Sequence, residues 1–260
     1  ILGPTYSEYS RELSFSGSTQ DYYHLQEAED FELDVEDLCR TLLNGYDFLI
    51  LCNPNNPTSS AILKDEMRAL LSFCANRDIF VMIDETYVEF APSVQEVTAV
   101  PYTKEFSNLM VLRGVSKFYA APGMRFGYGI TGNKEFLSQM KEKQIPWSLN
   151  SLGAYAGEQM FKDTSYIRQT RSLILTERDR MFLELKKMSS FKVYFPYGNF
   201  ILVKILKPEV TSFDVFEACI KERLMIRDCS SFQCLDGEFI RFCIMKPKDN
   251  NRLLKVLKTI

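Results

Sequence analysis

The first half of the chain alternates short apolar runs with amphipathic segments. A nearly continuous apolar run at 46–53 ends in an Asn- and Pro-rich turn at 53–58, as expected of a strand buried on both faces. Residues 61–77 carry apolar side chains at helical spacing. Further strands are predicted at 78–84, 108–115 and 125–131. Strand, helix and strand in this order predict an α/β fold with a doubly wound, mainly parallel sheet.

The pattern changes after residue 150. A long helical stretch places Ile174, Met181, Leu185 and Met188 along one stripe. A strand at 199–205, a helix at 213–223, strands at 225–227 and 239–245 and a closing helix from 250 follow, which is an α+β pattern. We therefore predict a large domain at 1–165 and a smaller C-terminal α+β domain at 166–260.

Composition excludes several classes of protein. The 260 residues are 46% hydrophobic and 25% charged, with a formal net charge of -3, as in an average soluble protein. No basic block favours nucleic acid as a partner, and no apolar run approaches the ~20 residues of a membrane span. Seven cysteines without a C-x-x-C pair predict reduced thiols and a cytoplasmic location. The single histidine, His24, argues against a metal site.

Polar residues gather where the predicted strands end. In an open parallel sheet, ligands bind outside the carboxyl ends of the strands. Taken singly, such residues are commonly turn formers, solvated amines or members of surface ion pairs. Together they predict a site for pyridoxal 5′-phosphate. The residues are Asn56 after the first strand, Asp84 and Tyr87 after the second, Ser116 and Lys117 after the third, and Arg125 eight positions beyond the lysine.

The roles of these residues follow from the chemistry of that cofactor. A lysine amine forms a Schiff base with the cofactor aldehyde, and a carboxylate near the ring nitrogen keeps that nitrogen protonated. Lys117 and Asp84 fit these two roles. Lys117 must also be a neutral amine when it moves protons, which burial and the nearby Arg125 would favour.

The remaining residues of the group suit the other polar atoms of the cofactor. Asn56 and Tyr87 can both donate hydrogen bonds to the phenolate oxygen. Ser116 and Arg125 supply a hydroxyl and a guanidinium for the phosphate.

Three segments resemble the signature blocks of the class I/II aminotransferases, which are fold-type-I pyridoxal-phosphate enzymes. They are CNPNNPTS at 52–59, IDETYVEF at 83–90 and SKFYAAPGMRFGY at 116–128. The resemblance implies catalytic roles for Lys117, Asp84 and Tyr87, a homodimer, and a small-molecule amino donor and 2-oxo acid acceptor as substrates. Pro4-Thr5-Tyr6 is similar to the family motif that places an aromatic ring, here Tyr6, over the cofactor face.

Two residues in the second half match substrate-binding positions of the family. Arg241 matches the arginine that clamps the acidic group of the substrate. The alternative for Arg241 is a strand arginine paired with Glu238 or Asp236. Asn199 resembles the asparagine that faces the substrate, and its alternative is a turn residue before a strand.

Two branches of the superfamily compete. The general pattern resembles the histidinol-phosphate aminotransferases, which act in amino-acid biosynthesis. The segments 146–150 and 226–232 look more like threonine-phosphate decarboxylase of cobalamin synthesis, and Arg227 is then a second candidate for an anionic group. We take transamination of a phosphorylated amino compound as the first interpretation, because it is the commoner chemistry on this scaffold, and decarboxylation as the alternative.

Two departures from the family pattern concern the cofactor phosphate. Ile1 is followed at once by a sequence typical of the interior of a fold, so we expect a further segment upstream, including the family's Gly-rich phosphate-binding turn. Gly114 stands where many relatives have a hydroxyl residue.

A second alternative is therefore a cofactor-free relative that acts as a binding module, although such a protein has no reason to keep Lys117, Asp84 and Arg125 together. A plain nucleotide binder would need a G-x-G-x-x-G or P-loop pattern, which 123–127 lacks.

Overall fold

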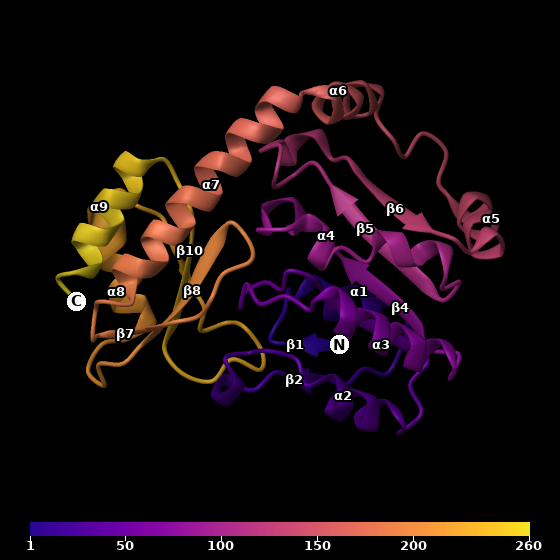
Figure 1. Ribbon diagram of the computed structural model, residues 1–260, viewed down its shortest axis with the longest axis horizontal. Coiled ribbons are helices and arrows are strands. Elements are labelled where there is room, and N and C mark those ends of the chain that lie inside the picture. The colour runs from indigo at the N-terminus through magenta and orange to yellow at the C-terminus, as the bar shows by residue number, and fades with distance from the viewer. The chain divides into compact units, whose positions relative to one another are not determined.

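A computed structural model describes residues 1–260 (Figure 1). The chain divides into two compact units. Unit 1 comprises Ile1–Glu32, Asn55–Ala61 and Thr170–Ile260, and unit 2 comprises Leu33–Pro54 and Ile62–Gln169. The predicted domains, 1–165 and 166–260, remain a prediction, and these units differ from them in grouping the first 32 residues and the loop 55–61 with the C-terminal part.

Unit 2 is built on a four-stranded sheet with the order β3-β4-β5-β6. Strands β3, β4 and β5 are parallel, and β6 is antiparallel to β5. The strands are β3 (Phe48–Cys52), β4 (Phe80–Asp84), β5 (Leu109–Gly114) and β6 (Gly127–Thr131). The helices are α2 (Val35–Leu42), α3 (Lys64–Ala75), α4 (Val94–Val97), α5 (Lys134–Lys143) and α6 (Ser151–Lys162), with 3₁₀ turns η2 (Val88–Phe90), η3 (Val100–Lys104) and η4 (Pro122–Met124).

The buried positions explain the parallel part of this sheet. Helix α3 packs against β4 and α2, and it buries Met67, Leu70, Leu71 and Cys74, which is the stripe that the spacing predicts. All four predicted strands form. Strand β6 departs from a wholly parallel sheet because the segment between β5 and β6 contains only the short η4 and no crossover helix, which a parallel connection requires.

Unit 1 contains a second four-stranded sheet, entirely antiparallel, with the order β7-β8-β10-β9. Its strands are β7 (Phe191–Val193), β8 (Phe200–Ile205), β9 (Arg227–Asp228) and β10 (Phe239–Cys243). Helix α8 (Ser212–Lys221) packs against α9 (Pro247–Leu257), β9 and β10. The N-terminal segment adds α1 (Glu8–Phe15), η1 (Glu27–Glu29) and a parallel pair of two-residue strands, β1 (Leu2–Gly3) and β2 (Tyr23–His24).

Helix α7 (Thr164–Leu185) is the predicted long helix. It buries Ile174, Met181 and Leu185. The prediction that Met188 continues the stripe is wrong, because the helix ends three residues earlier. No helix of the structure has both the length and the apolar character needed to cross a bilayer.

Glu27 ties the N-terminal segment of unit 1 to its antiparallel sheet. Lys204 Nζ donates to Glu27 Oε2 at 2.6 Å, and Tyr194 Oη donates to Oε1 at 2.8 Å. Burial raises the pKa of Glu27, but these hydrogen bonds lower it by more, so its pKa lies below the ordinary 4.5. A carboxyl with a depressed pKa contributes stability above its unfolded pKa, and this contribution is lost as the pH falls through the folded pKa.

We expect Glu27→Gln to lower the free energy of unfolding by about 1 kcal/mol at pH 7. The difference between variant and wild type should shrink as the pH falls below 4.5, because protonation removes the same charge from the wild type. Urea unfolding at several pH values measures both effects. Glu29→Gln, two residues away and exposed, is the control. A stability difference that is the same at pH 3 and pH 7 would show that the charge of Glu27 plays no part.

Candidate active site

Asp84 is the last residue of β4, at the carboxyl end of the parallel strands. In the sheet it pairs with Cys52 of β3 and Leu112 of β5. Its Oδ1 accepts hydrogen bonds from the Thr86 amide at 2.9 Å and from the Thr86 hydroxyl at 2.5 Å. These two bonds fix the carboxylate at the end of the strand.

Lys117 follows β5, the neighbouring parallel strand. The next residue, Phe118, is buried, and its ring packs against Phe90 and Tyr166 at centroid distances of 5.2 and 6.1 Å. Tyr166 Oη donates to the Phe118 carbonyl at 2.8 Å. The backbone at Lys117 is therefore anchored, while its side chain is exposed. The expectation that Lys117 is buried is wrong, because its side chain is exposed while Val115 and Phe118 nearby are buried.

Three more predicted residues lie in unit 2. Tyr87 is 8% exposed and precedes η2, three positions after Asp84. Ser116 is half-buried beside Lys117. Arg125 is exposed, adopts a left-handed backbone with φ 49°, and donates from Nη1 to the Pro122 carbonyl at 3.0 Å.

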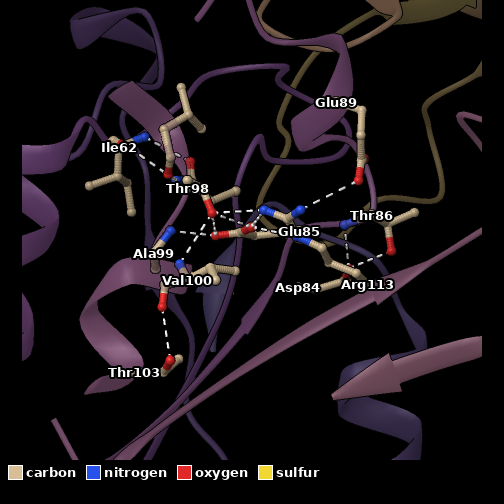
Figure 2. A network of polar contacts seen from close by, with 12 residues as sticks. Ile62, Asp84, Glu85, Thr86, Glu89, Thr98, Ala99, Val100, Thr103 and Arg113 are labelled. Carbon is tan, nitrogen blue, oxygen red and sulfur yellow. Dashed lines mark hydrogen bonds and ion pairs between the residues drawn. The ribbon is translucent and has the colours of Figure 1, made fainter. Parts of the chain in front are cut away.

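A buried ion pair lies beside these strand ends (Figure 2). Glu85 is 0% exposed, and Arg113 Nη2 lies 2.7 Å from its Oε2. Burial raises the pKa of Glu85. Burial also lowers the pKa of Arg113, but the Glu85 carboxylate raises it by more, so Arg113 stays charged. The sequence motifs do not mark this pair, since a Glu after an Asp and an Arg inside a strand are both commonplace.

In unit 1, Asn55 joins two loops that carry predicted residues. Its Nδ2 donates to the Pro4 carbonyl at 2.8 Å, and its Oδ1 accepts from the Thr5 hydroxyl at 3.0 Å. The side chains that follow in the two loops, Tyr6 and Asn56, line the same cavity. Asn55 was not among the predicted residues, although its place in the Asn- and Pro-rich turn was a signal.

That cavity in unit 1 has a volume of about 520 Å³. It brings together four predicted residues, Tyr6, Asn56, Arg227 and Arg241. Arg11 also lines it, so the wall carries three guanidinium groups, of which that of Arg11 is paired with Glu8 at 2.6 Å. A cavity of this charge favours an anionic ligand.

Arg241 projects from β10, and its Nη1 donates to Asn56 Oδ1. Its guanidinium lies over the Phe200 ring at 4.9 Å, and its buried Nε has no hydrogen-bond partner. The alternative of a strand ion pair is therefore wrong, since Glu238 instead accepts a hydrogen bond from the Ser212 amide at 2.6 Å. Arg227 is exposed on β9, and its Nη2 donates to Ser231 Oγ at 2.9 Å.

Asn199 immediately precedes β8, and its buried Oδ1 has no partner. The turn before it is held from two sides. Ser59 Oγ accepts from the Gly198 amide at 2.8 Å, and Arg178 Nη1 donates to the Tyr197 carbonyl at 3.1 Å. Burial lowers the pKa of Arg178. Sequence reasoning missed both supports, because each lies far from Asn199 along the chain.

The predicted residues thus fall into two groups. One, in unit 2, holds Asp84, Tyr87, Ser116, Lys117 and Arg125. The other, in unit 1, holds Tyr6, Asn56, Asn199, Arg227 and Arg241. An amine and a carboxylate at the ends of neighbouring strands fit an aldehyde cofactor with a basic ring nitrogen. The partnerless atoms Arg241 Nε and Asn199 Oδ1 fit a polar ligand.

Comparison with known proteins agrees with this chemistry. The chain is 30% identical to the threonine-phosphate decarboxylase of Salmonella typhimurium, covering 100% of this chain and 70% of that protein. It is 29% identical to the histidinol-phosphate aminotransferase of Methanococcus aeolicus, covering 99% and 67%. The crystal structure of the histidinol-phosphate aminotransferase from Clostridium acetobutylicum superposes with a TM-score of 0.93 at 33% identity, over 100% of this chain and 76% of that one.

The same fold recurs in the structure of L-threonine-O-3-phosphate decarboxylase from Porphyromonas gingivalis, with a TM-score of 0.85 at 25% identity over 100% and 75% of the two chains. These neighbours confirm the predicted fold class. The family described as aminotransferase class I and II matches residues 1–257. The match spans the three signature blocks, both units and the three arginines of the arginine-lined cavity. This chain is a member of the class I and II aminotransferase family.

Proposed function

We propose that this chain is a pyridoxal-phosphate-dependent aminotransferase that moves an amino group between a phosphorylated amino compound and a 2-oxo acid. Its family consists of aminotransferases and related pyridoxal-phosphate enzymes. The observation that carries the proposal is the pair of neighbouring strand ends, where Thr86 holds the Asp84 carboxylate and the Lys117 amine is exposed on an anchored backbone.

Unit 2 supplies the groups that act on the cofactor. Pyridoxal phosphate, when bound, supplies an aldehyde for amine capture and a ring that accepts electrons. Lys117 is the amine that binds the aldehyde and later moves the proton at the substrate Cα. Asp84 holds the positive charge of the ring nitrogen, and Tyr87 donates to the phenolate oxygen. Ser116 and Arg125 bind the phosphate.

Unit 1 supplies substrate recognition. Arg241 binds the carboxylate of the substrate, and its unpaired Nε is available as a second donor. Arg227 binds the other anionic group, because its hydrogen-bond partner is the neutral Ser231 hydroxyl. Tyr6 and Asn56 line the same cavity and serve the cofactor ring and its phenolate oxygen, and Asn199 faces the substrate.

A second candidate function is decarboxylation of threonine phosphate. The relative from Salmonella typhimurium carries that name at 30% identity. The guanidiniums of Arg227 and Arg241 in one cavity also suit a substrate with a carboxylate and a phosphate. The two reactions differ in which Cα bond stands perpendicular to the cofactor ring.

One experiment separates these functions. The purified protein is incubated with pyridoxal phosphate, and two products are measured side by side. Amino-group transfer from histidinol phosphate to 2-oxoglutarate supports the aminotransferase, and CO₂ release from threonine O-phosphate supports the decarboxylase. Neither product, with no cofactor bound, supports the cofactor-free binding module.

We also infer a cytoplasmic homodimer. All seven cysteines are free thiols, which supports a reducing compartment. Large apolar side chains stand exposed in unit 2 around α6, among them Trp147 at 97% and Leu152 at 77%, which supports a contact surface for another chain.

Removing the charge of Arg227 should weaken recognition of the phosphorylated substrate. We expect Arg227→Met to raise KM for that substrate by about 10- to 100-fold, since a charge-assisted hydrogen bond contributes about 1.5–3 kcal/mol. The KM for the 2-oxo acid should change less. Steady-state kinetics on both substrates measures the difference. Arg223→Met, which removes an exposed arginine that does not line the cavity, is the control, and equal KM values in wild type and Arg227→Met would contradict the assignment.

A further inference from the structure

Glu85 is a buried carboxylate that the proposed reaction does not use. It is 0% exposed and directly follows Asp84. A buried charge persists only when a partner and hydrogen bonds compensate the loss of water. A strand end needs no such group for folding alone, because an apolar residue fills the same volume at lower cost.

Strand β5 and the segment at 98–99 both contact the Glu85 carboxylate (Figure 2). Arg113 donates to its Oε2 from Nε at 3.0 Å and from Nη2 at 2.7 Å. The Thr98 hydroxyl lies 2.8 Å from Oε2, and the Ala99 amide donates to Oε1 at 2.5 Å. Arg113 Nη1 also lies 3.7 Å from Glu89 Oε1. Both oxygens of Glu85 are therefore engaged inside the chain.

The position of this contact in the sheet gives it a consequence for the active site. The Glu85 amide donates to the Leu112 carbonyl at 2.9 Å, so the β4–β5 ladder continues one step beyond Asp84. Arg113 is the next residue of β5. Ser116 and Lys117 leave the sheet three and four residues after it. The contact between Glu85 and Arg113 thus joins the points from which Asp84 and Lys117 project.

The contact also governs the charge at these strand ends. Arg113 is 17% exposed, so its positive charge is poorly screened by solvent. The carboxylates of Glu85, at 2.7 Å, and of Glu89, at 3.7 Å, compensate this charge. Other ionisable groups facing the pair are Glu89 at Arg113 Nη1 and Tyr128, which lies opposite Arg113 in the β5–β6 register. Without Glu85, Glu89 would be the only carboxylate still paired with the Arg113 guanidinium, one residue along β5 from the partner of Asp84 in the sheet.

We propose that Glu85 and Arg113 are a positioning pair: their contact fixes Asp84 relative to the Ser116-Lys117 segment and, together with Glu89, compensates the charge of Arg113 at these strand ends. This inference rests on the proposed function, since the cofactor is the group that Lys117 and Asp84 bind. Neither member of the pair touches the reacting atoms.

Two variants test the pair. Glu85→Gln keeps the size of the side chain and removes its charge, and Arg113→Lys keeps the charge and removes the planar fork. For each we expect the Kd for pyridoxal phosphate to rise about 10-fold or more, as when outer partners of a bound group are lost. In Glu85→Gln, the visible absorbance of the bound cofactor should titrate at a lower pH than in wild type, because removal of one negative charge near the strand ends disfavours a protonated nitrogen at Lys117. Arg113→Lys should leave that midpoint closer to wild type.

A readout without cofactor accompanies these measurements. Hydrogen exchange of the backbone at 113–121 should be faster in both variants than in wild type, because one strand end is released. Glu105→Gln is the matched control. It removes a glutamate that pairs with an arginine, Arg68, in the same unit, but on the surface, with side chains 47% and 59% exposed. It should change neither cofactor binding nor exchange at 113–121.

The outcomes of these measurements decide whether Glu85 and Arg113 are a positioning pair. Folded Glu85→Gln with wild-type Kd, titration midpoint and exchange would overturn the positioning pair. If Glu85→Gln does not fold, Arg113→Lys decides by the same three measurements. If neither folds, the pair serves the fold alone and the inference is wrong. If the wild type binds no cofactor but exchange still rises in the variants, the proposed function fails while the coupling of the two strand ends stands.

Discussion

Replacing Lys117 with alanine should reduce amino-group transfer by about 1,000-fold or more, because no other side chain at that strand end can capture the cofactor aldehyde and then move the Cα proton. Such a loss corresponds to roughly 4 kcal/mol of transition-state stabilisation. The variant should still fold, since the side chain is exposed and the backbone is anchored by Phe118 and Tyr166.

Covalent attachment gives a second measurement of the same residue. Borohydride reduction of the wild type with pyridoxal phosphate, followed by peptide mapping, should place the cofactor mass on the peptide that contains Lys117. The Lys117→Ala variant should show none. Lys104→Ala, an exposed lysine of the same unit, serves as the control and should behave as wild type. Cofactor attached to another lysine, or full turnover in Lys117→Ala, would remove the assignment.

Replacing Asp84 should produce the second largest loss. We expect Asp84→Ala to lower kcat on the order of 100- to 1,000-fold, comparable to deleting one preorganised electrostatic partner of a transition state. The physical reason is that the ring nitrogen loses the anion that keeps it positive, so the ring accepts electrons less well. The hydrogen bonds from Thr86 hold that anion in place in the wild type.

A second substitution separates charge from shape at this position. Asp84→Asn keeps an oxygen that can accept from Thr86 but carries no charge, and it should be nearly as slow as the alanine variant. Thr86→Val, which removes only the hydroxyl donor, should lose much less. Rates of Asp84→Asn close to wild type, measured in single turnovers with saturating cofactor, would mean that the carboxylate does not face the ring nitrogen.

Much of the fold could be predicted from the hydrophobic pattern, because strands β3, β4 and β5 of unit 2 are runs of apolar residues with buried side chains. The predicted helix after β3 forms for the same reason. The short strands β1 and β2 could not be predicted, since a strand of two residues has no periodicity to detect. The sequence also did not predict which segments make up unit 1, because this depends on contacts such as that of Glu27 with Lys204, which are 177 positions apart.

The residues of the candidate site also differ in whether the sequence could predict them. Residues that follow strands, such as Asp84 and Lys117, could be identified because local motifs and topology together place them at one edge of the sheet. Residues that hold others in place, such as Asn55, Ser59, Glu85 and Arg113, could not. Their partners are backbone atoms or distant side chains, so their roles exist only in three dimensions. The motif also did not predict that the Lys117 side chain is exposed.

Unit 1 combines N-terminal and C-terminal segments, which affects the order in which the protein folds on the ribosome. Its first 32 residues emerge early, but the strands they pack with, β8 and β10, are made last. Domains generally form as their segments leave the ribosome, and contacts of large sequence separation close slowly. The N-terminal segment can pair with itself in β1 and β2 and with Asn55, but its partners in the antiparallel sheet are synthesised only after all of unit 2. The arginine-lined cavity, which needs Tyr6 and Arg241 together, is among the last features of the nascent chain to form.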